Sequence, residues 1–276
     1  KPVKAIDDVT FPNVGKSDFD VYENNFLEVM QFVVNCTTFD SKNEVDTAFL
    51  AALKPLGVEP GKTFDRNKAV GIDGKRFRSI AEKVQKSEFA LAMDPAVTAE
   101  HGLSLFKTKG KITQKLLLMQ SVTGPIGLPA TEAVYPPVAT KDGQPMNEQH
   151  DYVIRMTKDQ LPPAKAFCSM KMYDSANGFF IPNNRKKYSV GENGGIKLNA
   201  DGGIDVYVAA EKPKSVPDEN WLPINRKDEN LDVILRIYMP DLEKYKTWKT
   251  SSKDKIALRK KDWTIVKWII SMRNGE

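Results

Sequence analysis

Residues 167–173 read FCSMKMY, and residues 233–238 read VILRIY. Both runs are short, rich in apolar side chains and closely followed by turn-forming residues, which is typical of β-strands. Residues 152–156 and 204–209 have the same character. Short strands separated by Gly, Pro, Asn and Asp indicate an antiparallel sandwich or barrel. We therefore expect a β domain in the second half of the chain.

The first half of the chain has a helical pattern instead. Apolar residues recur at three- and four-residue steps over residues 17–35, 43–54 and 75–93, which predicts three helices. Ser17 is the expected N-cap of the first helix. Residues 102–127 are amphipathic, but their pattern defines no single helix. We predict an α+β fold in which a helical N-terminal region precedes an antiparallel β-sandwich.

The character of the sequence changes near Gly124, where prolines become frequent. We divide the chain there into a helical region, residues 1–123, and a β domain, residues 124–250. Residues 251–276 are expected to be a basic C-terminal extension, since eight Lys or Arg and three acids lie between Lys249 and Glu276. A solvated tail explains this charge, so we do not expect the protein to bind nucleic acid.

The composition excludes several classes of protein. Of the 276 residues, 41% are hydrophobic and 28% charged, which is ordinary for a globular protein and excludes a disordered chain. No apolar run approaches the ~20 residues of a membrane helix, so we expect no membrane span. Two Cys and two His are too few for the common zinc and thiol–imidazole sites. We expect no metal and no cofactor.

The two cysteines, Cys36 and Cys168, lie far apart in the sequence. We favour two buried free thiols, because free Cys is among the most buried residue types. One disulfide between them is the alternative.

Arg, Tyr, Trp and Asn residues between residues 181 and 248 are the candidates for function. Arg236 and Tyr238 lie two residues apart in a predicted strand, so their side chains project from one face. The planar guanidinium of Arg binds carboxylate or phosphate through two hydrogen bonds. The candidate ligand-binding residues are Arg185, Asn220, Trp221 and Arg236, and the candidate catalytic residues are Tyr188 and Tyr238.

The same residues also have a purely structural interpretation. Trp221 would be buried and would lock a loop, and Arg236 would pair with an Asp in a turn. A catalytic role would require the candidate side chains to converge on one cavity within hydrogen-bond reach.

The order and spacing of several motifs resemble a protein family, the domain of unknown function 1214. The resemblance covers residues 132–249 and rests on Tyr135-Pro136, Lys141–Met146, Tyr152–Met156, Leu161–Phe167, Met172–Asp174, Arg185, Tyr188–Gly191, Leu198–Gly203, Asn220–Pro223, Leu235–Tyr238 and Thr247–Lys249. The helical half resembles the connector that precedes this domain. In that family the connector normally follows another β domain, of unknown function 1254. Cys168 stands where the family usually has Trp.

This resemblance implies a jelly-roll-like β-sandwich and frequent oligomers, but no agreed activity. Related proteins occur in bacteria, where they are often exported, and in large marine viruses. The resemblance therefore favours an exported, periplasmic or virion location over a cytoplasmic one, and a homo-oligomer.

Two classes of function are compatible with these observations. We favour a ligand- or partner-binding or structural protein, because His and Cys are scarce and no catalytic set is recognisable. The alternative is an enzyme that acts on an anionic or carbohydrate-like small molecule without a metal. In that enzyme Arg185 and Arg236 would hold the anion while Trp221 stacked on the substrate. Tyr188 or Tyr238 would transfer a proton, its pKa lowered by a neighbouring Arg.

Overall fold

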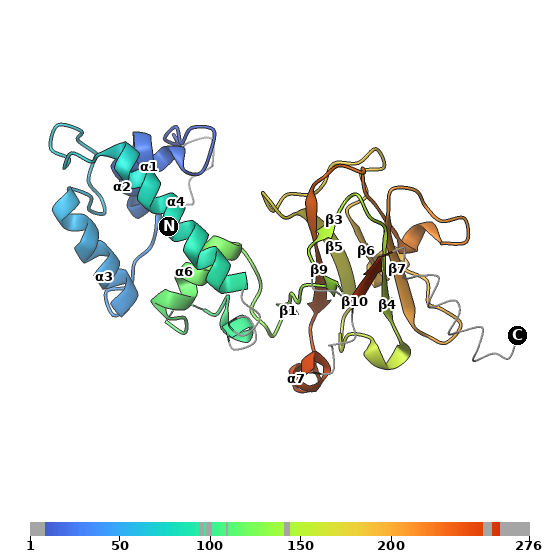
Figure 1. Cartoon of the computed structure of the whole chain (residues 1–276). Helices are drawn as coiled ribbons and strands as arrows, with labels where there is room; N and C mark the ends of the chain where they lie inside the picture. Colours follow the sequence, from blue (N-terminus) through green and yellow to red (C-terminus); the bar gives the residue numbers. More distant parts are fainter. Residues whose placement is uncertain are drawn as a thin grey trace, which may run out of the picture. The chain divides into compact units, whose positions relative to one another are not determined.

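The computed structural model describes residues 9–93, 97, 101–108, 110–140, 144–250 and 256–259. The chain divides into two compact units, residues 1–127 and residues 128–276 (Figure 1). The first unit is helical, and the second is built mainly from β-sheets. A helical N-terminal region followed by antiparallel-rich sheets is the coarse fold that the sequence predicted.

The helical unit is a succession of short and medium helices. Its core consists of buried residues from the second and third helices and the segment that follows them, with Leu27, Val34, Leu53 and Val58 packed together. The elements are α1 (Asp20–Asn24), α2 (Phe26–Cys36), α3 (Glu44–Leu53), η2 (Lys54–Leu56), α4 (Gly74–Met93), η3 (Gly102–Ser104) and α6 (Gln114–Thr123).

The first predicted helix, residues 17–35, is broken into α1 and α2 at Asn25. The backbone of Asn25 leaves the helical region (φ −156°, ψ 36°), and its side-chain amide donates to the carbonyl of Asn13. Ser17 is not the N-cap; that position is Phe19, which makes no side-chain cap. The apolar pattern could not predict the break, because a hydrogen bond between an Asn side chain and a distant carbonyl has no periodic signature.

The other two predicted helices, residues 43–54 and 75–93, correspond to α3 and α4. Asn43 caps α3, since its side-chain oxygen accepts hydrogen bonds from two amides of the first turn. Residues 102–127, whose pattern defined no single helix, contain the helix α6. Thr113 is its N-cap, and the hydroxyl of Thr113 accepts from an amide of the first turn.

The β unit contains two five-stranded sheets, which form two layers in Figure 1. Sheet A has the order β1 (Ala133–Val134), β9 (Asn230–Tyr238), β5 (Cys168–Asp174), β6 (Ser189–Gly191), with β3 (Met146–Asn147) also paired to β9. Sheet B has the order β2 (Ala139–Thr140), β10 (Ile256–Arg259), β4 (Tyr152–Met156), β7 (Ile204–Ala209), β8 (Trp221–Pro223). The shorter elements of the unit are η4 (Lys158–Gln160), η5 (Glu192–Gly194), η6 (Asp218–Asn220) and α7 (Leu242–Thr250).

The strand pairs are mostly antiparallel. All pairs of sheet A are antiparallel, whereas sheet B has two parallel pairs, β2 with β10 and β7 with β8. The pairing supports the predicted antiparallel-rich sheets, and the jelly-roll connection stays a prediction.

Strands β5 and β9 form the centre of sheet A and determine its two faces. Along β9 every second residue is buried between Leu231 and Ile237. Seven residue pairs hold the two strands in antiparallel register, with Lys171 opposite Ile234 and Tyr173 opposite Asp232. These side chains lie on the face turned away from the buried residues. We call it the outer face of sheet A.

The predicted basic extension, residues 251–276, is only partly described. Residues 256–259 form β10, which pairs with β2 and β4, and residues 251–255 and 260–276 lie outside the described residues. Among the helices that the structure describes, none is long and apolar enough to cross a membrane.

Both cysteines are free. Cys168 is buried as expected, but Cys36 is exposed at the end of α2, so the prediction that both thiols are buried is wrong for Cys36. Burial, with the nearby carboxylate of Glu192, raises the pKa of Cys168 to about 12. A thiol with this pKa is a packing residue rather than a nucleophile.

Asp20 connects the beginning of α1 to α4. One carboxylate oxygen accepts from a guanidinium N–H of Arg78 at 2.7 Å, and the other accepts from the backbone amides of Lys16 and Ser17 at 2.8 and 3.0 Å. Arg78 above all, together with these amides, holds the pKa of Asp20 well below its usual range.

We expect this contact to make the helical unit sensitive to acid. A carboxyl group whose pKa is lowered by folding stabilises the folded state above its unfolded pKa of about 4. This contribution is lost progressively as the pH falls below that value. The melting temperature, followed by circular dichroism from about pH 5 to about pH 2, should therefore fall more steeply for the wild type than for Asp20→Asn. Equal slopes would show that Asp20 does not couple protonation to folding.

Candidate functional site

A cavity of about 490 Å³ opens on the outer face of sheet A. Four of its lining residues are cationic and one is acidic, so its wall has a surplus of three positive charges. Such a surplus raises the local concentration of anions. We call this cavity the basic pocket, and its lining residues are Lys171 of β5, Ser189 of β6, Asp218 of η6 and the loop residues Phe180, Arg185, Lys186, Lys187 and Tyr188.

The side chain of Asn183 shapes the loop that carries three of these cations. Its amide donates to the carbonyls of Ile181 and Lys187, at 3.3 and 2.9 Å. Its oxygen accepts from the amides of Arg185 and Lys187, at 3.2 and 3.1 Å. Lys186 has a left-handed backbone (φ 50°), which is uncommon for a residue with a side chain. The hydrogen bonds of Asn183 therefore hold a tight turn that presents consecutive cations.

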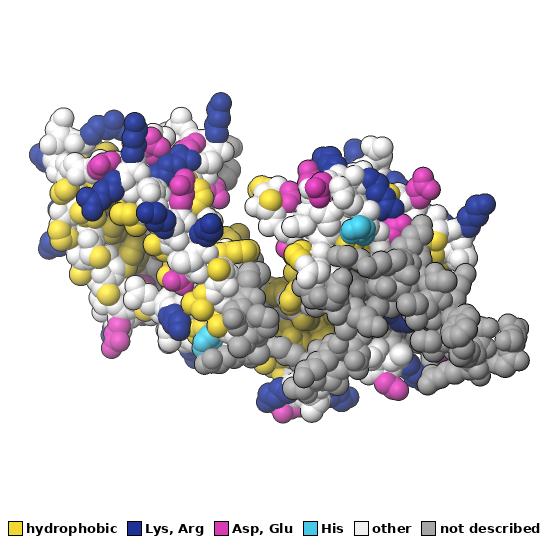
Figure 2. Space-filling model, viewed as in Figure 1, with side chains coloured by type: hydrophobic (Ala, Val, Ile, Leu, Met, Phe, Trp, Pro, Cys, Tyr) yellow, Lys and Arg dark blue, Asp and Glu magenta, His cyan; other side chains and the backbone are white. Residues whose placement is uncertain are grey.

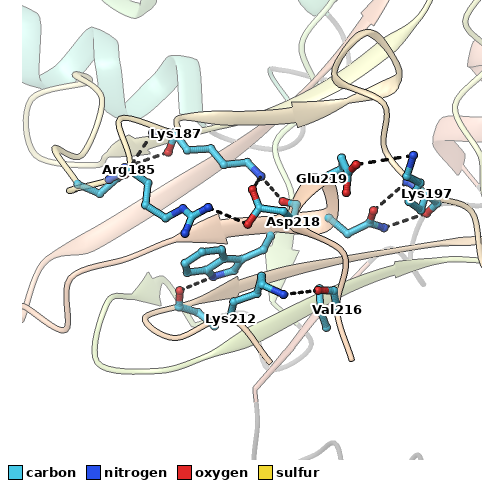
Figure 3. Close-up of polar contacts among 11 residues, drawn as sticks. Arg185, Lys187, Lys197, Lys212, Val216, Asp218 and Glu219 are labelled. Atoms are coloured by element: carbon cyan, nitrogen blue, oxygen red, sulfur yellow. Dashed lines mark hydrogen bonds and ion pairs between the residues drawn. The ribbon is translucent and has the colours of Figure 1, made fainter. Parts of the chain in front are cut away.

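The single carboxylate of the pocket wall is shared between two cations (Figure 3). Asp218 accepts from Nη2 of Arg185 at 2.9 Å. Nζ of Lys187 donates to the backbone carbonyl of Asp218. The same nitrogen lies 3.8 Å from the side-chain Oδ2 of Asp218. Lys171 instead lies over the ring of Phe180, with its Nζ 5.7 Å from the centroid. No ion pair involves Lys171 in the part of the chain that the structure describes.

Lys187 shows the electrostatic effect of this arrangement. Its side chain is 20% exposed. The pKa of its amine is lowered, mainly because burial disfavours the charged form, and Arg185 acts in the same direction while Asp218 opposes the shift. A negative charge bound beside this amine would offset both the burial and the repulsion. The electrostatics of the pocket therefore favour an anionic ligand.

Asn220 and Trp221 hold the fold and do not line the basic pocket. Asn220 is 3% exposed, and its side chain bonds the amide and carbonyl of Lys197 and the carbonyl of Asp205, at 2.8 to 2.9 Å. Trp221 is 5% exposed, and its indole N–H donates to a backbone carbonyl of β7. The structural interpretation fits both residues, although Arg185 Cζ lies 5.1 Å from the centroid of the Trp221 ring.

Arg236 lies on the same outer face, among three tyrosines. Its Nη2 donates to the hydroxyl of Tyr173 at 2.5 Å, and Tyr238 lies close enough to interact electrostatically with the guanidinium. Its Cζ lies 5.4 Å from the ring centroid of Tyr135 and 5.9 Å from that of Tyr173. Among the described residues no carboxylate pairs with Arg236, so the expected pairing with an Asp in a turn is wrong. We call these four residues the Arg236 cluster.

Arg236 does not activate Tyr135, whose ring lies beneath its guanidinium. Burial raises the pKa of Tyr135, and the charge of Arg236 offsets only part of this effect. The two candidate proton-transfer groups also belong to different clusters, with Tyr188 in the basic pocket and Tyr238 beside Arg236.

A stack of aromatic rings connects the two clusters. The rings of Tyr188 and Phe180 stack with centroids 5.0 Å apart, and Phe180 stacks on Tyr173 at 5.2 Å. Tyr173 is also the hydrogen-bond partner of Arg236. Four of the six candidate residues therefore belong to one surface, whereas Asn220 and Trp221 do not.

Several residues of these clusters were not among the sequence candidates. Lys171 and Tyr173 are two residues apart in a predicted strand, so their shared face was a usable signal. Phe180 and Lys187 reach the pocket from a loop, and no local pattern indicates this. Groups of three or more His, Cys, Asp or Glu side chains that could hold a metal ion do not occur among the described residues.

The structural role of Asn220 leads to a stability prediction. Asn220→Ala should lower the free energy of unfolding by about 2–4 kcal/mol, because backbone groups that the side chain now bonds lose their partners in a buried place. Chemical denaturation measures the change. Asn184→Ala, at an exposed position of the neighbouring loop, is the control and should change stability by less than about 0.5 kcal/mol. Equal effects of the two substitutions would contradict the structural role.

Comparisons with known proteins agree with the resemblance of the C-terminal half. Residues 132–242 match a family model described as protein of unknown function (DUF1214). No curated protein matches the chain. The VPA0106 protein from Vibrio parahaemolyticus, a solved structure, is 26% identical with a TM-score of 0.51, over 87% of this chain and 55% of that one. An uncharacterised protein from Burkholderia cenocepacia is 12% identical with a TM-score of 0.28, over 70% of this chain and 44% of that one.

The matched region contains all six candidate residues, from Arg185 to Tyr238. The chain spans about half the length of the two solved proteins. The second β domain of the paired family, of unknown function 1254, is not shown by these comparisons. The chain is therefore similar to the DUF1214 family over residues 132–242.

Proposed function

We propose that this protein binds an anionic small molecule in the basic pocket on the outer face of sheet A. The observation that carries the proposal is the charge of the pocket wall, which has four cations and one carboxylate. That carboxylate, on Asp218, is already shared between Arg185 and Lys187. An anion in the pocket would gain charge-assisted hydrogen bonds, which are about twice as strong as neutral ones.

Aromatic rings add an apolar part to the pocket wall. Phe180 is 41% exposed, and Tyr188 stacks on it. A ligand with a ring or an aliphatic part would contact these side chains while its acidic group met the cations. An organic acid or a sugar acid has this composition, in line with the anionic or carbohydrate-like ligand considered from the sequence.

The enzyme alternative has less support. Asp218 is held in ion pairs and is a poor general base for that reason. Of the two candidate proton-transfer groups, Tyr188 lines the basic pocket and Tyr238 lies beside Arg236. The homo-oligomer and the exported or virion location stay predictions, and neither depends on this pocket.

A ligand panel tests the proposal. Phosphate, citrate or glucuronate should raise the melting temperature of the wild type, whereas glucose, which lacks the carboxylate of glucuronate, should not. A ligand at 100 times its Kd adds about 2.7 kcal/mol, and each kcal/mol raises the melting temperature by about 2–4 °C, so we expect a shift of about 5–10 °C. Differential scanning fluorimetry measures the shift, and calorimetric titration gives the Kd. The double substitution Arg185→Gln with Lys187→Gln should abolish the shift, because it removes two of the cations.

The matched control is Lys244→Gln, because the side chain of Lys244 on α7 is 76% exposed and lies outside the pocket wall. This variant should respond to ligands like the wild type, and circular dichroism should show all variants folded. Retention of the shift in the double variant, or a wild type that responds to none of the anions, would contradict the proposal.

A further inference from the structure

The Arg236 cluster lies next to the basic pocket in the register of sheet A. Lys171, which lines the pocket, is opposite Ile234, and Arg236 is two residues further along β9. Diagonal neighbours on one face of a sheet are about 7–8 Å apart. Two cations of adjacent strands therefore project from the same face. Within the described residues, neither is paired with a carboxylate.

The side chain of Arg236 also leans toward the pocket. Its register partner on β5 is Ser169, yet its Nη2 reaches the hydroxyl of Tyr173, four residues further along β5. The ring of Tyr173 stacks on Phe180 in the pocket wall. Arg236 Cζ lies 5.9 Å from the ring centroid of Tyr173, and that centroid lies 5.2 Å from the ring centroid of Phe180. Arg236 Cζ is therefore at most about 11 Å from the Phe180 ring in the pocket wall.

The guanidinium of Arg236 has donors that the described residues do not satisfy. An Arg side chain has five N–H donors. The hydroxyl of Tyr173 accepts from Nη2, and Nε is buried without a hydrogen-bond partner in the described structure. Phenols are neutral and leave the positive charge unbalanced. A carboxylate at the Nη donors would balance this charge, because it is anionic and accepts charge-assisted hydrogen bonds from Arg.

We propose that the Arg236 cluster is a second anion subsite of the same surface, and that the ligand is an elongated dicarboxylate. This inference rests on the proposed function of the basic pocket. One carboxylate contacts the cations of the pocket, and the other contacts the guanidinium of Arg236. The rings of Phe180 and Tyr173 stack face to face, so their edges are what a ligand can contact. The body of the ligand lies along these edges.

A series of α,ω-dicarboxylates from malonate to azelate tests the inference at constant charge. Malonate is too short to span the two subsites, so it reports on the basic pocket. Calorimetric titration should find an intermediate length that binds at least about tenfold more tightly than malonate, which is the expected effect of an added charged hydrogen bond.

Arg236→Gln should lower the affinity for the best dicarboxylate to near that for malonate, so that the length-dependent advantage is lost. Tyr173→Phe keeps the ring stack but removes the hydroxyl that orients the guanidinium, so it should reduce the advantage of the longer dicarboxylates over malonate. This second variant keeps the test decisive if Arg236→Gln does not fold. Lys244→Gln, on exposed α7, is the control and should bind the whole series like the wild type.

The outcomes separate the two proposals. If malonate binds and Lys187→Gln weakens it, but longer dicarboxylates bind no better, the second subsite is wrong and the basic pocket stands. An advantage that survives in both Arg236→Gln and Tyr173→Phe also overturns the second subsite. If the wild type binds no member of the series, the second subsite is wrong, and the basic pocket is then judged by its response to phosphate, citrate and glucuronate.

Discussion

The antiparallel register between β5 and β9 is the constraint on which the rest of the β unit depends. A slip by one residue would exchange the two faces of a strand. It would bring Met170 and Met172 to the surface and bury Lys171 among apolar side chains without a partner, which is costly for a charged group. The same alternation that fills the core therefore places Lys171 and Arg236 together on the outer face of sheet A. The register of β5 and β9 therefore determines both the core and the candidate binding surface.

Arg155 and Arg236, both on inner strands of the β unit, show what distinguishes a structural charge from a candidate binding group. Arg155 on β4 donates to both oxygens of Asp205 on β7, at 2.8 and 2.6 Å, so its charge is balanced within the sheet. Arg236 on β9 is surrounded by tyrosines and has no carboxylate partner among the described residues. Arg236 therefore keeps a positive charge that no carboxylate among the described residues balances. This contrast supports a ligand-binding role for the outer face.

Particular residues show which features of the fold and of the candidate site can be predicted from the sequence. The two-residue spacing of Arg236 and Tyr238 predicts a shared face, and the burial pattern of β9 confirms it. That Lys171 stands beside Arg236 depends on the pairing of strands far apart in the chain, which no local pattern specifies. Asn220 and Trp221 looked like binding residues, because a polar or aromatic side chain in a loop has the same local sequence whether it satisfies buried backbone groups or contacts a ligand.

The most direct measurement of the central claim is an NMR titration of the isotope-labelled protein with citrate. If the outer face of sheet A binds anions, the backbone amide signals of residues 185–189 and of Lys171 and Phe180 should shift together and saturate with one Kd. Signals of the helical unit should stay in place. Shifts that never saturate and are spread over exposed lysines, or that are confined to the helical unit, would contradict the account.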